Sequence, residues 1–208
     1  MQFNQDFFDQ RFIIMEQLGF KSEFKSQLVG YIELLCKTND EFNLVSRKMT
    51  FEELIDNHII DSMLPLKYFP QNIKTVADLG SGGGLPAVIF AIQFPQIKFH
   101  LYEKSKLKQT FLNDCQKIAA NIQIFGEIPP QLTGIDLITA RGFKPIDEIV
   151  QFTKKYYSQN GRYFLLKARK EKIDEEINLT IKKQKDFNCQ IEQLKSPVLD
   201  VERHLIII

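Results

Sequence analysis

The sequence predicts an α/β protein in which a helical N-terminal segment precedes a mostly parallel sheet. Up to residue 70, apolar side chains recur every three or four residues, which is the pattern of amphipathic helices. Beyond that point short apolar runs alternate with helical stretches, and such alternation is typical of parallel sheets covered on both faces. We therefore expect a helical arm over residues 1–70 and a sheet domain over residues 71–208.

The individual elements follow from the same patterns. In the arm, Thr50 and Glu53 form a capping box that begins a helix over residues 51–68. The expected strands cover residues 75–79, 98–102, 122–125, 135–139, 162–168, 189–194 and 204–208. Further helices are expected over residues 86–94, 104–120 and 171–185, and after Pro145. Because no helix separates the last two strands, we expect them to be antiparallel at the sheet edge.

Size and composition are those of an ordinary globular protein. The 208 residues are 44% hydrophobic, and a formal net charge of +1 gives the whole molecule no general attraction for a polyanion. The charge is uneven, since residues 1–140 carry 13 basic and 16 acidic side chains and residues 141–208 carry 14 and 10. A nucleic acid would therefore have to be held by a local patch, and the basic excess lies in the C-terminal third.

The sequence predicts neither secretion, nor a membrane span, nor a metal site. The N-terminus lacks a basic region followed by an apolar stretch, and the longest apolar run, over residues 85–94, is about half a membrane span. The three cysteines are far apart and form no CxxC pattern. His58 and Asp61 are three residues apart on one expected helix and could pair, although a packing contact is the simpler interpretation. We expect a cytoplasmic monomer without metal or membrane partner.

The strongest local signal is the glycine loop Asp78–Pro86, which follows the first expected strand. Glycines allow a sharp turn and a close approach of the backbone to a ligand, at the strand end where open α/β sheets bind ligands. A dinucleotide fingerprint would require a third glycine where this loop has Leu85. The loop therefore does not predict a nicotinamide or flavin dinucleotide.

S-adenosylmethionine fits the same loop better, because it requires a glycine turn and a carboxylate at the end of each of the first two strands. Asp78 and Glu103 supply these carboxylates, and Glu103 follows Gly80 by 23 residues, close to the roughly 20 typical of a ribose-binding acid. We predict cofactor contacts from both acids and from the loop residues Gly80, Ser81 and Gly82. The alternative interpretation is a glycine turn that binds no ligand.

The segment after the fourth strand, residues 139–143, commonly faces the methyl acceptor in such folds. It is not the Asn/Asp-Pro-Pro-aromatic sequence that binds an exocyclic amine, and it lacks the cysteine that carbon-5 methylation of pyrimidines requires. Guanine N7 needs neither, because its lone pair is free and no proton has to leave, so that catalysis reduces to positioning. Arg141 is expected to anchor the cofactor carboxylate or a phosphate, and the alternative is a structural salt bridge.

A basic cluster lies between Lys154 and Lys172, where seven basic residues accompany one acidic residue. Lys167 and Arg169 follow the fifth expected strand at its carboxyl end, on the same edge as the glycine loop. An RNA backbone would lie there, and we predict RNA contacts from these two side chains. The alternative is an ordinary solvated surface.

The chain resembles the RsmG (GidB) family, bacterial enzymes that methylate N7 of a guanine in 16S ribosomal RNA. The resemblance covers most of the chain and includes the glycine loop and residues 139–143. Its most specific parts are the Asn-Leu-x-x-Arg motif at 43–47, the His-x-x-Asp-Ser motif at 58–62 and the Glu-Arg-His-Leu sequence at 202–205.

The resemblance implies a Rossmann-like class I S-adenosylmethionine-dependent methyltransferase sheet with an N-terminal helical extension. It implies 16S rRNA in the 30S subunit as partner, and RNA contacts from Arg47, Lys167 and Arg203. It further implies cofactor contacts at the following residues: Gly80, Leu85, Gly126, Glu127 and Arg141. The chain departs from the family pattern in two places, with Ala87 in place of a glycine and no arginine just before Glu127.

Two other functions are compatible with the sequence. One is a methyltransferase for a small molecule or a protein, which the basic cluster disfavours because a small substrate needs no charged surface. The other is an RNA-binding assembly factor that retains the fold without catalysis, which cofactor binding would exclude.

Overall fold

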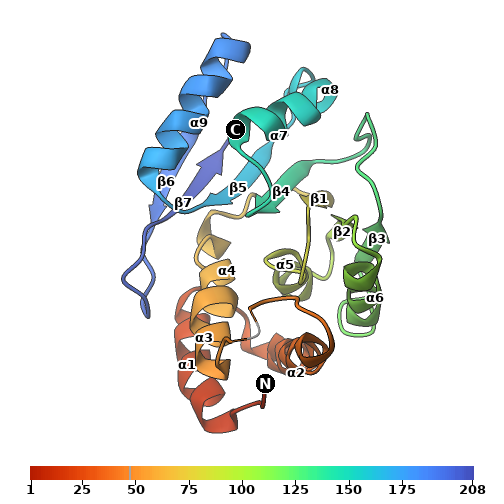
Figure 1. Cartoon of the computed structure of the whole chain (residues 1–208), viewed down its shortest axis with the longest axis vertical. Helices are drawn as coiled ribbons and strands as arrows, with labels where there is room; N and C mark the ends of the chain where they lie inside the picture. Colours follow the sequence, from red (N-terminus) through yellow and green to blue (C-terminus); the bar gives the residue numbers. More distant parts are fainter. Residues whose placement is uncertain (47) are drawn as a thin grey trace.

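Seven strands form one sheet in the order β3-β2-β1-β4-β5-β7-β6, and helices cover it on both sides (Figure 1). The computed structural model describes residues 1–46 and 48–208. Neighbouring strands from β3 to β5 are parallel, whereas β7 is antiparallel to both β5 and β6. The strands are β1 Thr75–Leu79, β2 Lys98–Tyr102, β3 Ile122–Phe125, β4 Leu137–Arg141, β5 Tyr163–Lys167, β6 Gln190–Leu194 and β7 Arg203–Ile207.

The helical arm precedes the sheet, and the remaining helices connect its strands. The arm contains α1 Gln5–Gln17, η1 Ser22–Phe24, α2 Lys25–Glu41, α3 Phe51–Leu54, η2 Ile55–Ile60, α4 Asp61–Met63 and η3 Leu66–Tyr68. The sheet region contains α5 Ala87–Gln93, α6 Lys106–Cys115, α7 Ile146–Phe152, α8 Lys154–Tyr157 and α9 Lys170–Lys183. Among the described residues, none of these helices combines the length and apolar character that a bilayer span requires.

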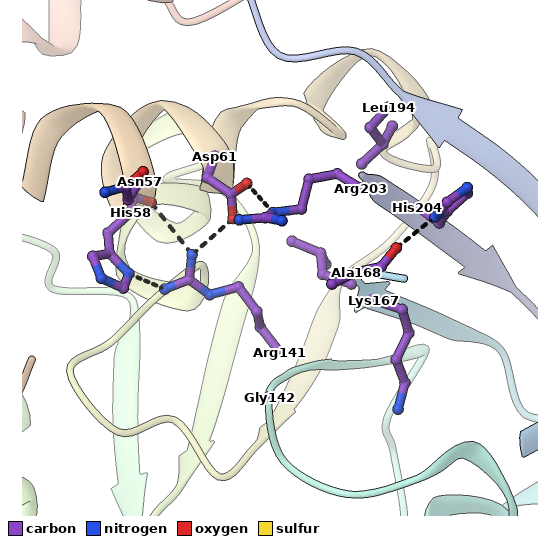
Figure 2. A pocket seen from close by; sticks show the side chains of 11 residues that line it. Asn57, His58, Asp61, Arg141, Gly142, Lys167, Ala168, Leu194, Arg203 and His204 are labelled. Carbon is purple, nitrogen blue, oxygen red and sulfur yellow. Dashed lines mark hydrogen bonds and ion pairs between the residues drawn. The ribbon is translucent and has the colours of Figure 1, made fainter. Parts of the chain in front are cut away.

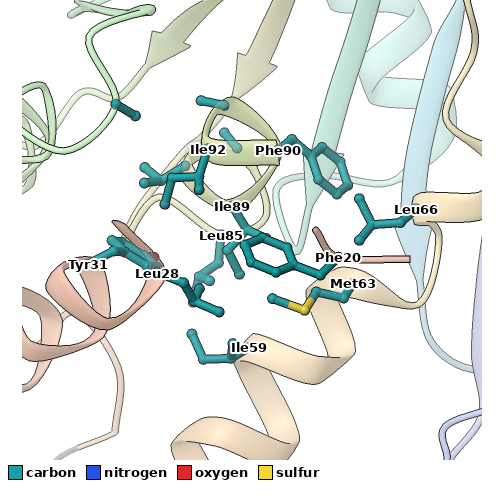
Figure 3. Close-up of a cluster of buried hydrophobic side chains, with 14 of the residues drawn as sticks. Phe20, Leu28, Tyr31, Ile59, Met63, Leu66, Leu85, Ile89, Phe90 and Ile92 are labelled. Carbon is teal, nitrogen blue, oxygen red and sulfur yellow. The ribbon is translucent and has the colours of Figure 1, made fainter. Parts of the chain in front are cut away.

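Alternating side chains of the strands place the two halves of the core on opposite faces of the sheet. Val76 of β1 belongs to a core shared with the arm, α5 and α6, whereas Ala77 and Leu79 belong to a core shared with α7, α8 and α9. Figure 3 shows the first core, where Leu28 and Ile59 of the arm lie near α5. The arm therefore packs on the same face of the sheet as α5 and α6.

Most predicted elements are confirmed, including the antiparallel last pair at the sheet edge and the capping box of Thr50 and Glu53. The fourth strand was predicted two residues too early, because its register with β1 pairs Val76 with Leu137 and carries the strand on to Arg141. The single helix predicted over residues 51–68 was also wrong. A π-helical turn, η2, interrupts it, and the chain leaves the helix at Pro65.

A hydrogen bond from the arm holds the glycine loop. The hydroxyl of Tyr31, in α2, donates to the carbonyl oxygen of Gly83 at 2.6 Å, and the Tyr31 side chain is buried. Burial raises the pKa of Tyr31 well above its ordinary value, so that the hydroxyl remains a donor. The arm thereby helps to fix the loop between β1 and α5.

Replacing Tyr31 by phenylalanine leaves the Gly83 carbonyl without this donor. We expect Tyr31→Phe to lower the free energy of unfolding by about 1–3 kcal/mol, the usual effect of an unsatisfied buried polar group. Urea denaturation followed by circular dichroism measures it. Tyr68→Phe is the control, since the Tyr68 hydroxyl makes no hydrogen bond within the described part of the chain. Equal stability of the two variants would contradict the role of Tyr31.

Candidate functional site

The predicted cofactor residues come together at the carboxyl ends of β1, β2 and β4. These strands are neighbours in the order β2-β1-β4. From β1 to β3 each new strand is added on one side of β1, and the chain then crosses to the other side of β1 to form β4. A doubly wound sheet binds ligands at such a switch point, because the loops there diverge and leave a crevice. Gly80 follows β1, Glu103 follows β2 and Arg141 ends β4.

The glycine loop turns sharply against the end of β2. The backbone amides of Gly80 and Ser81 both donate to the Tyr102 carbonyl, at 2.9 and 3.1 Å. Gly80 has φ +71°, and a Cβ at this position would lie 2.3 Å from Cδ2 of Phe143. Only glycine therefore fits between this turn and the segment after β4.

Asp78 lies beneath the loop and is almost completely buried. The Thr139 hydroxyl, in β4, donates to its Oδ1 at 2.7 Å. Burial raises the pKa of Asp78 from 3.8 to about 6, while bonds from Ser81 and Thr139 and the charge of Arg141 oppose this shift. The structure thus makes Asp78 an internal partner of β4, and its direct contact with a cofactor stays a prediction.

Glu103 joins the loop to the end of β2. Its Oε2 accepts from the Gly82 amide at 2.9 Å, and its Oε1 accepts from the Ser105 amide at 2.8 Å. The side chain is half-buried, so the free lone pairs of both carboxylate oxygens remain available at the carboxyl end of β2. A carboxylate held in this way can accept hydrogen bonds from the two hydroxyls of a ribose.

The turn after β3 lies beside Glu103. The Glu103 amide donates to the Phe125 carbonyl, and the Gln109 side chain donates to the Glu103 carbonyl at 2.6 Å. A Cβ on Gly126 would lie 3.4 Å from Nε2 of Gln109, while Glu127 is exposed. Gln109, a neutral amide, therefore lies at the turn where the family pattern commonly has an arginine.

Leu85 is 7% exposed and belongs to the core shared by the arm and α5 (Figure 3). Its side chain packs inward. A contact between this residue and a cofactor would therefore come from its backbone.

Arg141 turns toward the arm, at a cavity of about 430 Å³ (Figure 2). Its Nη1 lies 3.3 Å from Oδ2 of Asp61 and 3.4 Å from the His58 carbonyl, and its Nη2 lies 3.3 Å from Nδ1 of His58. Asp61 also accepts from Nε of Arg203 at 2.5 Å. The expected neighbours His58 and Asp61 thus meet through Arg141.

His58 is neutral at physiological pH in this setting. Burial, with the charges of Arg141 and Arg203, lowers the pKa of His58 from 6.5 to about 4. Its unprotonated Nδ1 therefore accepts from the guanidinium of Arg141. The ring orients an arginine and carries no charge of its own.

The predicted RNA-binding residues have different surroundings. Lys167 is largely buried, with its Nζ donating to the Lys144 carbonyl at 2.7 Å and lying 2.8 Å from a carboxylate oxygen of Glu176. Arg169 is exposed at the start of α9, and its side chain has no hydrogen bond or ion pair among the described residues. Arg203 lies at the cavity with Asp61. Arg47 lies outside the described residues.

Sequence reasoning missed two parts of this arrangement. It found no role for Asp61 beyond a pairing with His58, although Asp61 contacts both Arg141 and Arg203. It also missed the hydroxyl of Thr139 as partner of Asp78. The His-x-x-Asp-Ser motif was the available signal for Asp61, but its partners lie 80 and 142 residues away in the sequence.

Comparison with known proteins assigns the chain to a family. The model of the family GidB, described as rRNA small subunit methyltransferase G, matches residues 24–206. Ribosomal RNA small subunit methyltransferase G 1 of Bdellovibrio bacteriovorus is 57% identical, over 97% of this chain and 98% of that protein. This chain belongs to the GidB (RsmG) family. A second member, ribosomal RNA small subunit methyltransferase G of Brachyspira hyodysenteriae, is 32% identical over 88% of this chain and 90% of its own.

Solved structures of other methyltransferases share the fold of this family member. A precorrin-6y C5,15-methyltransferase from Geobacter metallireducens has a TM-score of 0.54 at 15% identity, over 82% of this chain and 94% of its own. A ribosomal protein L11 methylase from Lactobacillus delbrueckii also has a TM-score of 0.54 at 14% identity, over 71% and 76%. The predicted Rossmann-like methyltransferase fold and the family resemblance are both confirmed.

Gly80 and Gly134 allow the effect of a clash to be separated from that of backbone strain. Both have positive φ, +71° and +68°, but a Cβ on Gly134 would meet no atom within 4 Å. We expect Gly134→Ala to destabilise the protein by about 1–2 kcal/mol, the strain of a left-handed alanine. Gly80→Ala should destabilise it more and weaken S-adenosylmethionine at least tenfold in calorimetry. Similar values for the two variants would show that Phe143 does not restrict the loop.

The raised pKa of Asp78 predicts a pH-dependent stability. Well below pH 3.8 the carboxyl is protonated in both folded and unfolded states, whereas above pH 6 the folded state has to bury its charge. Between pH 5 and pH 8 the free energy of unfolding of Asp78→Asn should therefore gain about 1–2 kcal/mol relative to the parent protein. Urea titrations at both pH values measure the change. A difference independent of pH would mean that Asp78 ionises normally.

Proposed function

We propose that this protein transfers the methyl group of S-adenosylmethionine to N7 of a guanine in the 16S rRNA of the small ribosomal subunit. Membership of the GidB family supports the reaction class. The structural observation that carries the proposal is the glycine loop, whose Gly82 amide donates to Glu103, together with a cavity lined by Arg141 of β4 and Arg203 of β7. The rRNA substrate implies a cytoplasmic protein, and we propose that it acts as a monomer.

The residues at the ends of β1 and β2 fit S-adenosylmethionine. Glu103 would accept hydrogen bonds from the ribose hydroxyls, since two backbone amides hold its carboxylate at the carboxyl end of β2. A Cβ on Gly82 would meet only the Gly80 carbonyl within 4 Å, so the loop backbone there is open to a ligand. The cofactor supplies an electrophilic methyl group on a sulfonium. Gly126 and Glu127 follow Phe125, whose carbonyl accepts from the Glu103 amide, and would complete the nucleoside side of the site.

Guanine N7 as the acceptor agrees with the groups at the cavity. Its lone pair is free, so no residue has to remove a proton, and the protein has to hold the base in line with the methyl group. Among the described cavity residues, His58 is the only histidine that contacts Arg141. Its Nδ1 accepts a hydrogen bond from that arginine, so this nitrogen is not available as a base. The methylated ring becomes cationic, and the pairing of Arg141 with Asp61 would offset the positive charge of that guanidinium near such a ring.

For the RNA backbone, the exposed Arg169 and the cavity arginine Arg203 are the best placed of the predicted contacts. Lys167 would first have to break its ion pair with Glu176. Arg47, outside the described residues, remains a predicted contact from the family resemblance.

The proposal is tested by incubating the protein and labelled S-adenosylmethionine with unmethylated 30S subunits and, separately, with free 16S rRNA. Label is expected on one guanine, and borohydride and aniline treatment, which cleaves RNA at 7-methylguanosine, identifies the atom. Label on another nucleotide or atom, or on neither substrate, would refute the assignment. Label on 30S subunits alone would show that the protein recognises the assembled particle.

Glu103→Ala should weaken S-adenosylmethionine by about 1–3 kcal/mol, because hydrogen bonds to a charged group are lost. Isothermal calorimetry measures this directly. The matched control is Glu53→Ala, since Glu53 also accepts from a backbone amide, that of Thr50 at 2.9 Å, but lies in the capping box of α3. Cofactor affinity should be unchanged in the control, and an equal loss in both variants would remove Glu103 from the site.

A further inference from the structure

Glu103, the predicted ribose-binding acid, is held by hydrogen bonds to its main chain as well as to its carboxylate. Its amide donates to the Phe125 carbonyl at 3.0 Å, and its carboxylate accepts from the amides of Gly82 and Ser105. Its carbonyl accepts from Nε2 of Gln109 at 2.6 Å, the shortest of these four contacts. Three of the bonds come from backbone groups, whereas the fourth comes from a side chain. A substitution of Gln109 therefore removes one bond to Glu103 and leaves the other three.

The Gln109 side chain replaces the next hydrogen bond of the β2–β3 ladder. In a parallel pair, the amide and the carbonyl of one residue bond to residues two positions apart on the neighbouring strand. Since the Glu103 amide donates to Phe125, the ladder would continue with the Glu127 amide donating to the Glu103 carbonyl. Within the described part of the chain no backbone amide donates to that carbonyl, and β3 ends at Phe125. Gln109 thus satisfies the carbonyl where the two strands separate.

The first turn of α6 places this carboxamide. Gln109 is four residues after the N-cap Ser105, so the two residues lie on one face of the helix. The Gln109 amide donates to the Ser105 carbonyl at 2.9 Å, and the Ser105 amide donates to the Glu103 carboxylate at 2.8 Å. α6 also packs beside β3 (Figure 1). The helix therefore holds Glu103 through both its main chain and its side chain.

The surroundings of the carboxamide determine its orientation. A carbonyl only accepts, so the nitrogen faces Glu103, and the oxygen lies 3.4 Å from Nζ of the exposed Lys106. The nitrogen also lies 3.4 Å from the point that a Cβ on Gly126 would occupy. Gln109 is therefore close to the ends of both β2 and β3. Because the chain has no arginine just before Glu127, a neutral donor holds this part of the site.

The place of the Glu103 carboxylate depends on the place of its main chain. Glu103 lies between β2, which ends at Tyr102, and α6, which begins at Lys106, so it belongs to neither element. Hydrogen bonds between a hydroxyl and a carboxylate require about 2.7 Å between the oxygens. A shift of the Glu103 main chain by a fraction of an ångström would therefore weaken its bonds to a ribose.

We propose that Gln109 is a positioning residue of the cofactor site, which by donating to the Glu103 carbonyl holds the Glu103 carboxylate where it accepts hydrogen bonds from both ribose hydroxyls of S-adenosylmethionine. The proposal rests on the proposed function, because it concerns the same cofactor site. Gln109 acts through Glu103 and makes no contact with the cofactor itself.

The first test measures what the ribose hydroxyls contribute to binding. Isothermal calorimetry compares S-adenosylhomocysteine, which contains the nucleoside of the cofactor, with its 2′,3′-dideoxy analogue. The parent protein should bind the analogue at least about tenfold more weakly, since hydrogen bonds to a charged group are lost. Gln109→Met keeps the length of the side chain and removes the donor. It should bind S-adenosylhomocysteine roughly fivefold more weakly than the parent protein does, and the analogue within about twofold of the parent value.

An equal loss for both ligands in Gln109→Met would show that Gln109 does not act through the ribose contact. Unchanged affinity for S-adenosylhomocysteine would show that it has no part in the site. Either result would overturn the proposal.

Gln116→Met is the matched control. Gln116 is the C-cap of the same helix, and its Nε2 donates to the Ile122 carbonyl at 3.1 Å, at the amino end of β3. Both variants lose one bond from a glutamine to a backbone carbonyl, so both should lower the melting temperature. Gln116→Met should keep the parent affinity for both ligands. A loss of the ribose preference in this variant would assign the effect to general loosening of α6 and contradict the proposal.

Two further variants decide the outcome if Gln109→Met does not fold. Gln109→Lys retains an N–H donor and should keep most of the preference for S-adenosylhomocysteine over the dideoxy analogue. Gln109→Glu has the shape of glutamine without the donor and should lose that preference. Equal preference in the two variants would contradict the role of the donor.

Failure of the proposed function gives a different result from failure of this proposal. A parent protein that binds neither ligand would refute the proposed function. A parent protein that binds both ligands equally would refute the ribose contact of Glu103 and, with it, the role of Gln109. A parent protein that prefers S-adenosylhomocysteine, together with a Gln109→Met variant of the same preference, would refute only the role of Gln109.

Discussion

Hydrogen bonds to its backbone hold the glycine loop in place at the carboxyl end of β1, beside the predicted cofactor site. The Glu103 carboxylate accepts from Gly82, and the Tyr31 hydroxyl donates to Gly83, so β2 and the arm hold adjacent residues of one turn. Gly80 can lie against Phe143 because it has no Cβ. A loop held by its neighbours from both sides is pre-organised, and ligand binding then has little conformational entropy to overcome.

The arm takes part in the site as well as in the core. Its side chains pack on the same face of the sheet as α5 and α6, in one continuous apolar cluster. The same packing brings the π-helical turn to the ends of β4 and β7, where Asp61 meets two arginines. Burial of an ion pair is favourable only when its geometry is good and its remaining groups are bonded, and His58 and its carbonyl satisfy Arg141 here. Packing of the arm and electrostatics of the cavity therefore depend on each other.

Much of the fold could be predicted from the sequence because periodicity is a local property. The alternation of short apolar runs with helices predicted seven strands and their positions along the chain, and the glycines with Asp78 and Glu103 located the predicted cofactor site. The start of β4 was predicted two residues early because Ile135 extends the apolar run, whereas pairing with β1 and β5 determines where the strand lies. The π-turn in residues 55–60 was not predictable, since its sequence has ordinary helical spacing.

The sequence by itself determined the fold class, the family and the glycine loop with its two acids, because each depends on residues close together along the chain. Only the tertiary structure decided how these residues are used. In the folded chain Asp78 is buried against Thr139, the Glu103 carboxylate lies at the carboxyl end of β2, and Arg141 points toward the arm. The partners of Asp61 lie in elements that only chain folding brings together, and burial, which sets the charge of His58, is a property of the folded state.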